Sequence, residues 1–151
     1  MLGSKKRSVL FVDWKNVLQS QIAEELLEKK QGEIFEAYSA GPNHDCVDCD
    51  ALVAMMDAGH DIRRRFSKNF RALENMNFDY VVIMDEASAE VPAEHLPPHG
   101  KRIVKIFGGR ECFVANDDRE LFDCYQALID EIGAWLDVAF ASHESADALT
   151  E

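Results

Sequence analysis

The chain has 151 residues, the length of one domain, and its composition of 47% hydrophobic and 29% charged residues excludes a chain that is disordered as a whole. The formal net charge of −12 excludes a general nucleic-acid binder, because binding to phosphates requires a positive surface. Residues 117–151 hold ten acidic residues and one basic residue, so the rest of the chain carries little net charge and can bind an anion locally. No apolar run reaches the ~18 residues of a membrane span, and we expect a cytoplasmic protein without membrane contacts.

The first part of the chain contains two strand patterns separated by a helix pattern. Val9–Val12 is an apolar run without alternation, which is typical of a strand buried on both faces of a parallel sheet. Residues 20–27 place apolar side chains at helical spacing, which predicts a helix. A second strand is predicted over residues 34–40, and Gly41 begins the turn that ends it.

The middle of the chain contains two further helix patterns and two further strand patterns. A helix is predicted from Asp48, a suitable N-cap, to residue 58. A shorter helix is predicted to begin at Ser67. The apolar runs 80–84 and 103–107 predict a third and a fourth buried strand.

The end of the chain is predicted to hold the longest helix. Apolar residues keep helical spacing over 121–136 and lose it over 139–151, which we expect to be an acidic, frayed tail. The alternation of strands and helices predicts an α/β domain with a parallel sheet. In such sheets ligands bind at the carboxyl ends of the strands, so the segment Asp13–Ser20, which follows the first strand, is the candidate site.

A series of short motifs runs in order along residues 8–90. The segment after the first strand keeps Asn16 and Ser20 of the pattern Cys-x-x-Asn-x-x-Arg-Ser, and the next helix keeps the pair Ala23-Glu24. The series continues with Tyr38-Ser39-Ala40-Gly41, Val47-Asp48, Ala51, Met55, Gly59-x-Asp61-Ile62, Ser67-Lys68 and Asp79-Tyr80-Val81-Val82. In these motifs and their order, the sequence resembles the low-molecular-weight protein tyrosine phosphatases and the thioredoxin-coupled arsenate reductases.

The resemblance implies both a fold and an anion-binding loop. The implied fold is a flavodoxin-like domain over residues 1–138, followed by the tail 139–151. Its sheet has four parallel strands in the order 2-1-3-4, with helices on both faces. The residues that stand in the family's anion loop are Trp14, Lys15, Asn16, Val17, Leu18 and Ser20. Ser39 and Arg65 are the expected supports of the loop, with Arg65 where the family often has a histidine.

The catalytic groups of that family are replaced or missing in this sequence. Asp13 stands where the family has its nucleophilic cysteine, and Gln19 stands where it has the arginine that holds the oxyanion. Residues 110–114 lack the Asp-Pro pair of the general acid, and residues 84–92 lack the two redox cysteines of the reductases. We therefore expect a catalytically inactive binding or regulatory module without a cofactor, whose partner is a protein or a small oxyanion.

Asp13 is open to two hypotheses. In the first, the inward N–H groups of the loop and a cation, Lys15 or Arg65, hold the carboxylate in the place of an oxyanion and lower its pKa. In the second, Asp13 is a nucleophile that retains phosphatase activity. Phosphotransferases with an aspartate nucleophile also use a magnesium ion and a second Asp two residues after the nucleophile. In this sequence Lys15 stands at the position of that second Asp.

A different class of function is suggested by the acidic residues that follow apolar runs. Asp13, Asp48, Asp85 and Glu86 have a spacing that resembles the metal ligands of NYN/PIN-type nucleases, which cleave RNA with metal ions held at strand ends. The net charge of −12 argues against an RNA substrate. A plain interaction module is the third class that we consider.

Cys46 and Cys49 have the C-x-x-C spacing of metal and redox sites. A structural zinc site requires a second pair of ligands, and the other two cysteines, Cys112 and Cys124, are far along the chain with a different spacing. A redox pair is the other hypothesis, because a cysteine in the first turn of a helix has a lowered thiol pKa. We expect no metal site and four free thiols.

Overall fold

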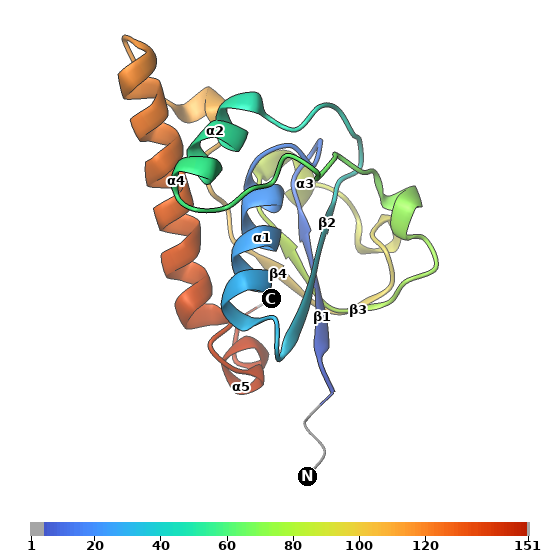
Figure 1. The fold of residues 1–151 in the computed structure, drawn as a ribbon. Coiled ribbons are helices and arrows are strands. Elements are labelled where there is room, and N and C mark those ends of the chain that lie inside the picture. The colour runs from blue at the N-terminus through green and yellow to red at the C-terminus, as the bar shows by residue number, and fades with distance from the viewer. Residues whose placement is uncertain (1–4, 151) are drawn as a thin grey trace.

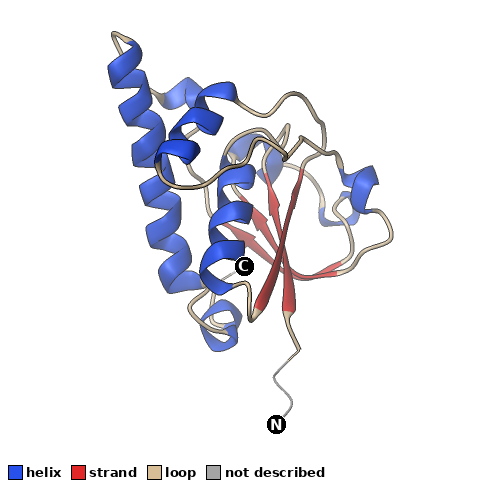
Figure 2. Cartoon of the chain, viewed as in Figure 1, coloured by secondary structure: helices blue, strands red, loops and turns tan. Residues whose placement is uncertain are grey.

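The computed structural model describes residues 5–150, which form one parallel sheet with helices against it (Figures 1 and 2). The strands pair in the order β2-β1-β3-β4, which confirms the predicted topology. The strands are β1 (Arg7–Val12), β2 (Phe35–Ala40), β3 (Phe78–Ile83) and β4 (His99–Val104). The helices are α1 (Gln19–Gln31), α2 (Cys49–Asp57), α3 (Glu86–Ala89), α4 (Asp118–Ala139) and α5 (His143–Asp147), with the 3-10 helices η1 (Phe70–Leu73), η2 (Ala93–His95) and η3 (Arg110–Cys112).

Burial on both faces of the sheet explains the apolar run of β1. Val9 and Phe11 belong to the core beneath α1, α2 and α4, whereas Leu10 and Val12 belong to a second core on the opposite face. All four side chains are completely buried. Because successive side chains of a strand point to opposite faces, a strand covered on both sides requires an apolar residue at every position.

The two faces of the sheet are covered unequally. The long helices α1 and α4 lie together on one face, and α2 packs against α4 there, as Figures 1 and 2 show. The other face is covered by shorter elements, including η1 and the segment around α3. The longest helix, α4, is amphipathic, with its apolar stripe in the first core. Within residues 5–150, no helix has both the length and the apolar character needed to cross a membrane.

The fourth strand lies earlier in the chain than the apolar run 103–107 predicts. β4 pairs with β3 from His99 to Val104, and pairing ends there because β3 itself ends at Ile83. Beyond the paired residues, the N–H groups of Lys105 and Phe107 donate to the carbonyls of Ile83 and Met84, at 2.9 Å and 3.0 Å. The first residues of β4 are polar because β4 is an edge strand, and for this reason the search for a buried apolar run missed them.

The shorter helix that we predicted from Ser67 begins later. The observed element is the 3-10 helix η1, which begins at Phe70 after the N-cap residue Asn69. The Ser67 hydroxyl instead donates a hydrogen bond of 2.6 Å to the carbonyl of Lys15, in the loop after β1. Ser67 therefore contributes to the loop and does not cap a helix.

The prediction that residues 139–151 form a frayed tail is wrong for the part that the structure describes. Ser142 caps the short helix α5, and Ala146 within this helix is completely buried. Phe140 is also completely buried, with its ring edge-on to those of Phe11 and Phe35. Helical periodicity is lost after residue 138 because the chain turns to close the first core, not because it leaves the domain.

Polar contacts fasten α5 to the amino end of the sheet. The guanidinium of Arg7, in the first position of β1, lies 2.7 Å from the carboxylate of Asp147 and 2.6 Å from the hydroxyl of Tyr80. Tyr80 also donates to Asp147 at 2.6 Å. The end of the described chain is thus held against its beginning.

Candidate functional site

The segment between β1 and α1 forms a loop at the carboxyl edge of the sheet (Figure 1). Asn16 has a φ of 54°, in the left-handed region that Asn tolerates better than most residues. Its N–H donates to the carbonyl of Asp13 at 3.2 Å, which closes a tight turn. After this turn, the N–H groups of Val17, Leu18 and Ser20 point back toward the end of β1.

The carboxylate of Asp13 fills the centre of this loop. One oxygen, Oδ1, accepts the N–H of Val17 at 3.1 Å. The other, Oδ2, accepts the N–H of Leu18 at 3.3 Å, the N–H of Ser20 at 2.9 Å and the hydroxyl of Ser20 at 2.7 Å. Only 2% of Asp13 is exposed. The prediction that the N–H groups of the loop hold this carboxylate is confirmed.

The predicted cation beside Asp13 is not observed. Lys15 pairs with Asp45 at 3.6 Å, and Arg65 is held by glutamates of α1. Burial raises the pKa of Asp13 above its ordinary value; the hydrogen bonds from Ser20 and Val17 oppose this effect without reversing it. The expectation of a lowered pKa is therefore wrong, because desolvation outweighs the donors and, within residues 5–150, neither Lys15 nor Arg65 pairs with this carboxylate.

Asn16 joins the loop to two neighbouring segments. Its side-chain nitrogen donates to the hydroxyl of Ser20 at 2.8 Å, which orients that hydroxyl toward Asp13. Its Oδ1 accepts the backbone N–H of Lys68 at 2.9 Å and the side-chain nitrogen of Gln21 at 2.9 Å. Asn16 and Gln21 are both buried. Gln21 was not among the predicted site residues, because nothing in the sequence separates it from a polar residue on a helix surface.

The end of β2 approaches the loop so closely that only glycine fits at residue 41. A Cβ atom added to Gly41 would lie 2.2 Å from the carbonyl oxygen of Asp13 and 3.1 Å from that of Trp14. Such a contact is far shorter than atoms tolerate, so one of the two backbones would have to move. The sequence indicated only that Gly41 ends a strand. The structure shows that the lack of a side chain at this position lets the loop after β1 pack against the end of β2.

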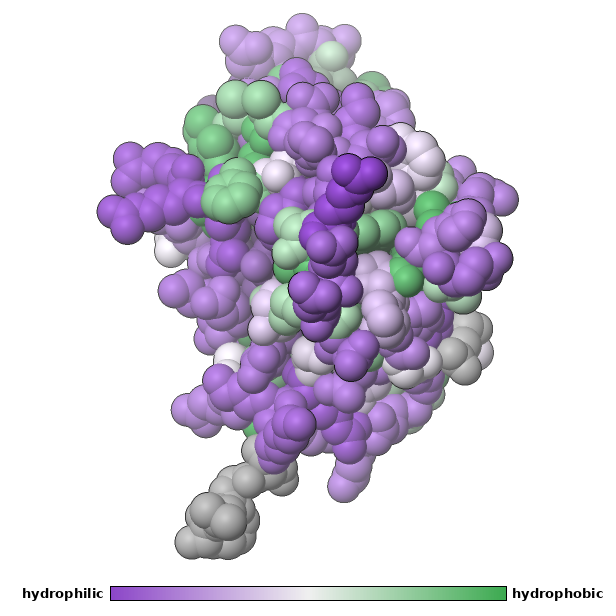
Figure 3. Space-filling model, turned by 90° about the vertical axis from the view of Figure 1, so that its right-hand side faces the viewer, coloured by the Kyte–Doolittle hydropathy of each residue, from purple (hydrophilic) through white to green (hydrophobic). Residues whose placement is uncertain are grey.

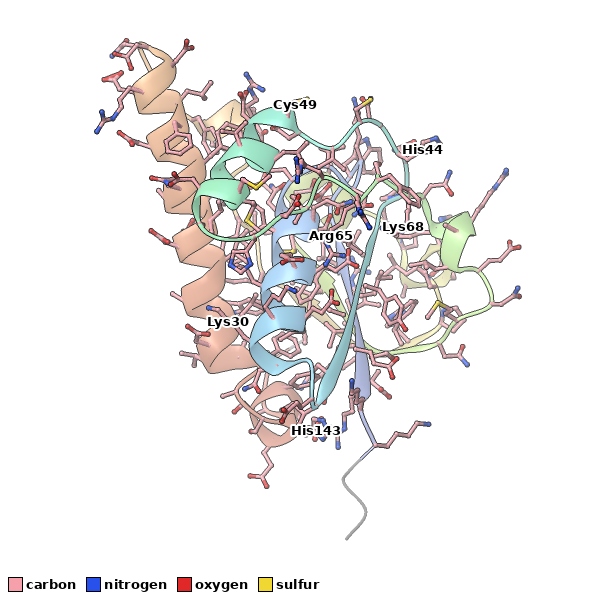
Figure 4. All side chains as sticks on the ribbon, viewed as in Figure 1. Lys30, His44, Cys49, Arg65, Lys68 and His143 are labelled. Carbon is pink, nitrogen blue, oxygen red and sulfur yellow. The ribbon has the colours of Figure 1, made fainter. Side chains whose placement is uncertain are left out.

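Arg65 supports α1 rather than the loop. It comes from the segment between α2 and η1 that crosses α1, where Figure 4 labels it near Lys68. Its guanidinium lies 2.9 Å from Glu24, 2.6 Å from Glu25 and 2.8 Å from Glu28. These three glutamates lie on one side of α1, because they are spaced at one, three and four residues.

Ser39, the other predicted support, reaches the same cluster. Its hydroxyl donates to the carboxylate of Glu24, and Ser39 itself is completely buried in β2. Burial raises the pKa of Glu24, and the hydrogen bond from Ser39 opposes that rise. Ser39 and Arg65 therefore hold Glu24 from two sides and fix α1 against β2, one layer behind the loop.

The side chain of Gln19 reaches the segment after β4. Its side-chain nitrogen donates to the carbonyl of Phe107 at 3.0 Å, and the residue is buried. The loop after β4, which contains Gly109 and Glu111, lies directly over this amide. Gln19 therefore ties the first turn of α1 to the segment beyond β4.

A cavity of about 270 Å³ opens beside the loop. Its walls include four acidic residues, Asp13, Asp48, Asp85 and Glu111, and two basic residues, Lys15 and Arg110. The structure thus brings together the three aspartates of the nuclease hypothesis. Within residues 5–150, however, no group of three or more His, Cys, Asp or Glu side chains could hold a metal ion.

The carboxylates of these three aspartates accept hydrogen bonds from the fold. Asp48 caps α2 with one oxygen and accepts the hydroxyl of Tyr125 at 2.6 Å with the other. Asp85 caps α3 with one oxygen and accepts the N–H of Trp14 at 2.8 Å with the other. Asp13 is occupied by the loop. Each carboxylate is a structural acceptor, and nothing in their arrangement supports a metal-dependent nuclease.

The four cysteines are free thiols. Cys46 is exposed in the segment before α2, and Cys49, which Figure 4 labels, is exposed as the first residue of α2. Cys112 is exposed after β4, and Cys124 is half-buried on α4. Cys46 and Cys49 lie outside the contacts that hold the loop.

The molecule is a four-stranded parallel sheet with a loop of inward N–H groups between β1 and α1, an arrangement that suits an anion. Residues 8–138 match the family model of the low molecular weight phosphotyrosine protein phosphatases. The chain belongs to this family.

Similarity to individual proteins agrees with this assignment. An arsenate reductase of Bacillus licheniformis is 30% identical over 130 residues, which cover 85% of this chain and 91% of that protein. The structure of Wzb from Vibrio vulnificus in complex with benzylphosphonate is 21% identical with a TM-score of 0.66, covering 87% of this chain and 97% of the other. A low molecular weight protein tyrosine phosphatase from T. tengcongensis is 23% identical with a TM-score of 0.64, covering 87% and 96%. These structures share the flavodoxin-like fold of this chain.

Proposed function

We propose that this protein is a catalytically inactive member of its family, which acts as a binding or regulatory module. The observation that carries the proposal is the Asp13 carboxylate, which accepts three backbone N–H groups and the Ser20 hydroxyl in the centre of the loop. The chain's own anion thus occupies the place where the fold would hold an oxyanion. A second anion there would be repelled by Asp13 and would find its donors already used.

The chemistry of the replaced residues supports the same conclusion. In the alignment of motifs, Asp13 takes the place of the family's cysteine and Gln19 that of its arginine. Thiolate chemistry on phosphorus or arsenic needs the nucleophile, and the oxyanion needs the arginine's charge in the transition state. Gln19 is neutral and donates to the carbonyl of Phe107 instead.

Asp13 is also poorly suited to replace the cysteine as a nucleophile. Both of its oxygens accept hydrogen bonds, and only 2% of the residue is exposed. An attacking carboxylate oxygen would have to leave the N–H groups that the substrate also needs. Residual phosphatase activity with Asp13 as nucleophile is therefore the weaker candidate.

Phosphate binding and turnover test the proposal. We expect the wild-type protein to hydrolyse no p-nitrophenyl phosphate between pH 5 and 7.5, to reduce no arsenate, and to bind phosphate or vanadate at least tenfold more weakly in calorimetry than the double variant Asp13→Cys/Gln19→Arg. Wild-type turnover that disappears in Asp13→Ala would overturn the proposal. So would phosphate binding by the wild type as tight as that of the double variant.

A further inference from the structure

The surface beside the loop is built around an exposed tryptophan whose backbone is fixed. Trp14 is 39% exposed, although its N–H donates to Asp85 at 2.8 Å and its carbonyl accepts the N–H of Asn43 at 3.1 Å. A large aromatic side chain on a fixed backbone loses little conformational entropy on binding, and tryptophan is enriched at the centres of interfaces. Trp14 therefore points to a binding surface.

Trp14 forms a wall of two neighbouring cavities of different character. The first, of about 440 Å³, is lined mainly by apolar residues of the loop, the end of β2, η1 and the α3 segment: Trp14, Pro42, Phe70, Ala87, Val91 and Pro92. The second is the cavity of about 270 Å³ beside Asp13, in which acidic side chains outnumber basic ones. One cavity suits an apolar side chain, and the other suits a positive charge.

The basic residues near the second cavity already have partners. Lys15 pairs with Asp45 at 3.6 Å, and Arg110 pairs with Asp50 at 3.1 Å. Glu111, and Glu90 on the wall of the first cavity, are exposed and form no ion pair among residues 5–150. The two cavities therefore present carboxylates to any occupant.

We propose that this pair of cavities binds a peptide segment of a partner protein in which an apolar or aromatic residue lies close to a lysine or arginine. The apolar side chain enters the cavity between Trp14 and Phe70, and the basic side chain lies against Glu111 and Asp85, where it also contacts the face of Trp14. This inference rests on the proposed function, because the partner replaces the oxyanion that the filled loop excludes.

Charge excludes other occupants of this surface. A phosphopeptide would bring a second anion to a cavity with four acidic side chains, and a second copy of this chain would bring a net charge of −12. Figure 3, which views the side on which η1 projects, shows apolar patches separated by hydrophilic side chains. A surface of this kind fits a short segment with one apolar anchor better than a broad apolar interface.

Two-dimensional NMR tests this proposal on the whole chain. The chain has two tryptophans, and Trp135 packs against Phe107 and Phe140, so its indole N–H is an internal reference for that of Trp14. The probe is a set of acetylated pentapeptides with one Phe or Leu and one Lys or Arg at varied spacing. The matched set carries Glu in place of the basic residue, and a third set carries phosphotyrosine.

We expect the basic set to shift the Trp14 indole and the N–H groups of residues 85–91 at millimolar concentration or below, without shifting Trp135. Glu111→Gln and Trp14→Ala should each weaken this binding at least fivefold, whereas Glu33→Gln, the same charge change at the amino end of β2, should not. No shift with any basic peptide, or equal binding of the Glu set, would overturn the inference but leave the proposed inactivity intact. Preferential binding of the phosphotyrosine set would overturn both.

Discussion

Asp13 lies in the loop before α1 and Arg65 lies against the side of α1, and the molecule stabilises these two opposite charges by different means. Asp13 is surrounded by neutral donors, namely backbone N–H groups and one hydroxyl. Arg65 is surrounded by three carboxylates. The same helix, α1, supplies both environments: the N–H groups around its start face Asp13, and its glutamates face Arg65.

The difference shows that backbone donors alone can surround a buried carboxylate, whereas a buried guanidinium is surrounded by charged side chains. Backbone dipoles at a helix start hold an anion whatever the side chains are. A carboxylate placed there needs no cation, so Arg65 is left to fasten the segment between α2 and η1 onto α1. Four predictions test this contrast, beginning with the largest effect.

Removing the Arg65 guanidinium should be the most damaging change. Arg65→Met removes the guanidinium that pairs with Glu24, Glu25 and Glu28, and breaking a largely buried ion pair costs about 3 kcal/mol. The free energy of unfolding, measured with urea, should fall by this amount. Arg63→Met is the control, because Arg63 forms an exposed pair with Asp61 and its loss should matter little. Equal losses for the two variants would show that Arg65 is not a central support.

Removing the Asp13 carboxylate should cost less, and an anion should restore part of the loss. Asp13→Ala leaves buried N–H groups without an acceptor, which costs about 2 kcal/mol. Phosphate can accept the same N–H groups and should therefore bind to the variant. A phosphate concentration on the order of 20–50 mM, near the dissociation constant of a weakly bound anion, should raise the melting temperature of the variant more than that of the wild type. Chloride at the same ionic strength serves as the control. Equal effects of phosphate on both proteins would contradict the idea that Asp13 occupies an anion site.

The pH dependence of stability should reveal the buried acid. Burial raises the pKa of Asp13 in the folded state, so the folded protein takes up the proton more readily than the unfolded chain. The stability contribution of Asp13 is therefore fully present below its ordinary pKa of about 3.9 and is lost as the pH rises through the folded-state pKa. The free energy of unfolding of the wild type relative to Asp13→Asn should decrease as the pH rises above about 4. Since the raised pKa of Glu24 is common to both proteins, it cancels in this difference. A relative stability that rises with pH would indicate a hidden cation beside Asp13.

Replacing Lys15 should have the smallest effect. Its only ion pair among residues 5–150 joins it to Asp45 at the surface, at 3.6 Å. Lys15→Met should leave both the unfolding curve and the pH dependence of stability unchanged within error, because exposed pairs are screened by water. A steeper pH dependence in this variant would show that Lys15 compensates the charge of Asp13 after all.

Local patterns predicted the layers of the fold and the position of the site. The apolar run of β1 identified the central strand, and the segment after it contained the loop with Asp13 at its centre. The polar start of β4 and the α5 helix were missed, since an edge strand and a closing turn have no strong periodicity of their own. The position of Arg65 was also missed, because its three partners are 37–41 residues away in the sequence. Ion pairs between residues so far apart in the sequence can be identified only in the folded structure.

The contact between Arg7 and Asp147 fixes where this protein can be attached to something else. It places the beginning of β1 and the end of α5 together at the amino end of the sheet, whereas Trp14 and its two cavities lie at the carboxyl end. A label or a cross-link attached next to Arg7 or Asp147 would therefore lie on the far side of the molecule from the proposed peptide site. It would leave that site open to a partner in solution.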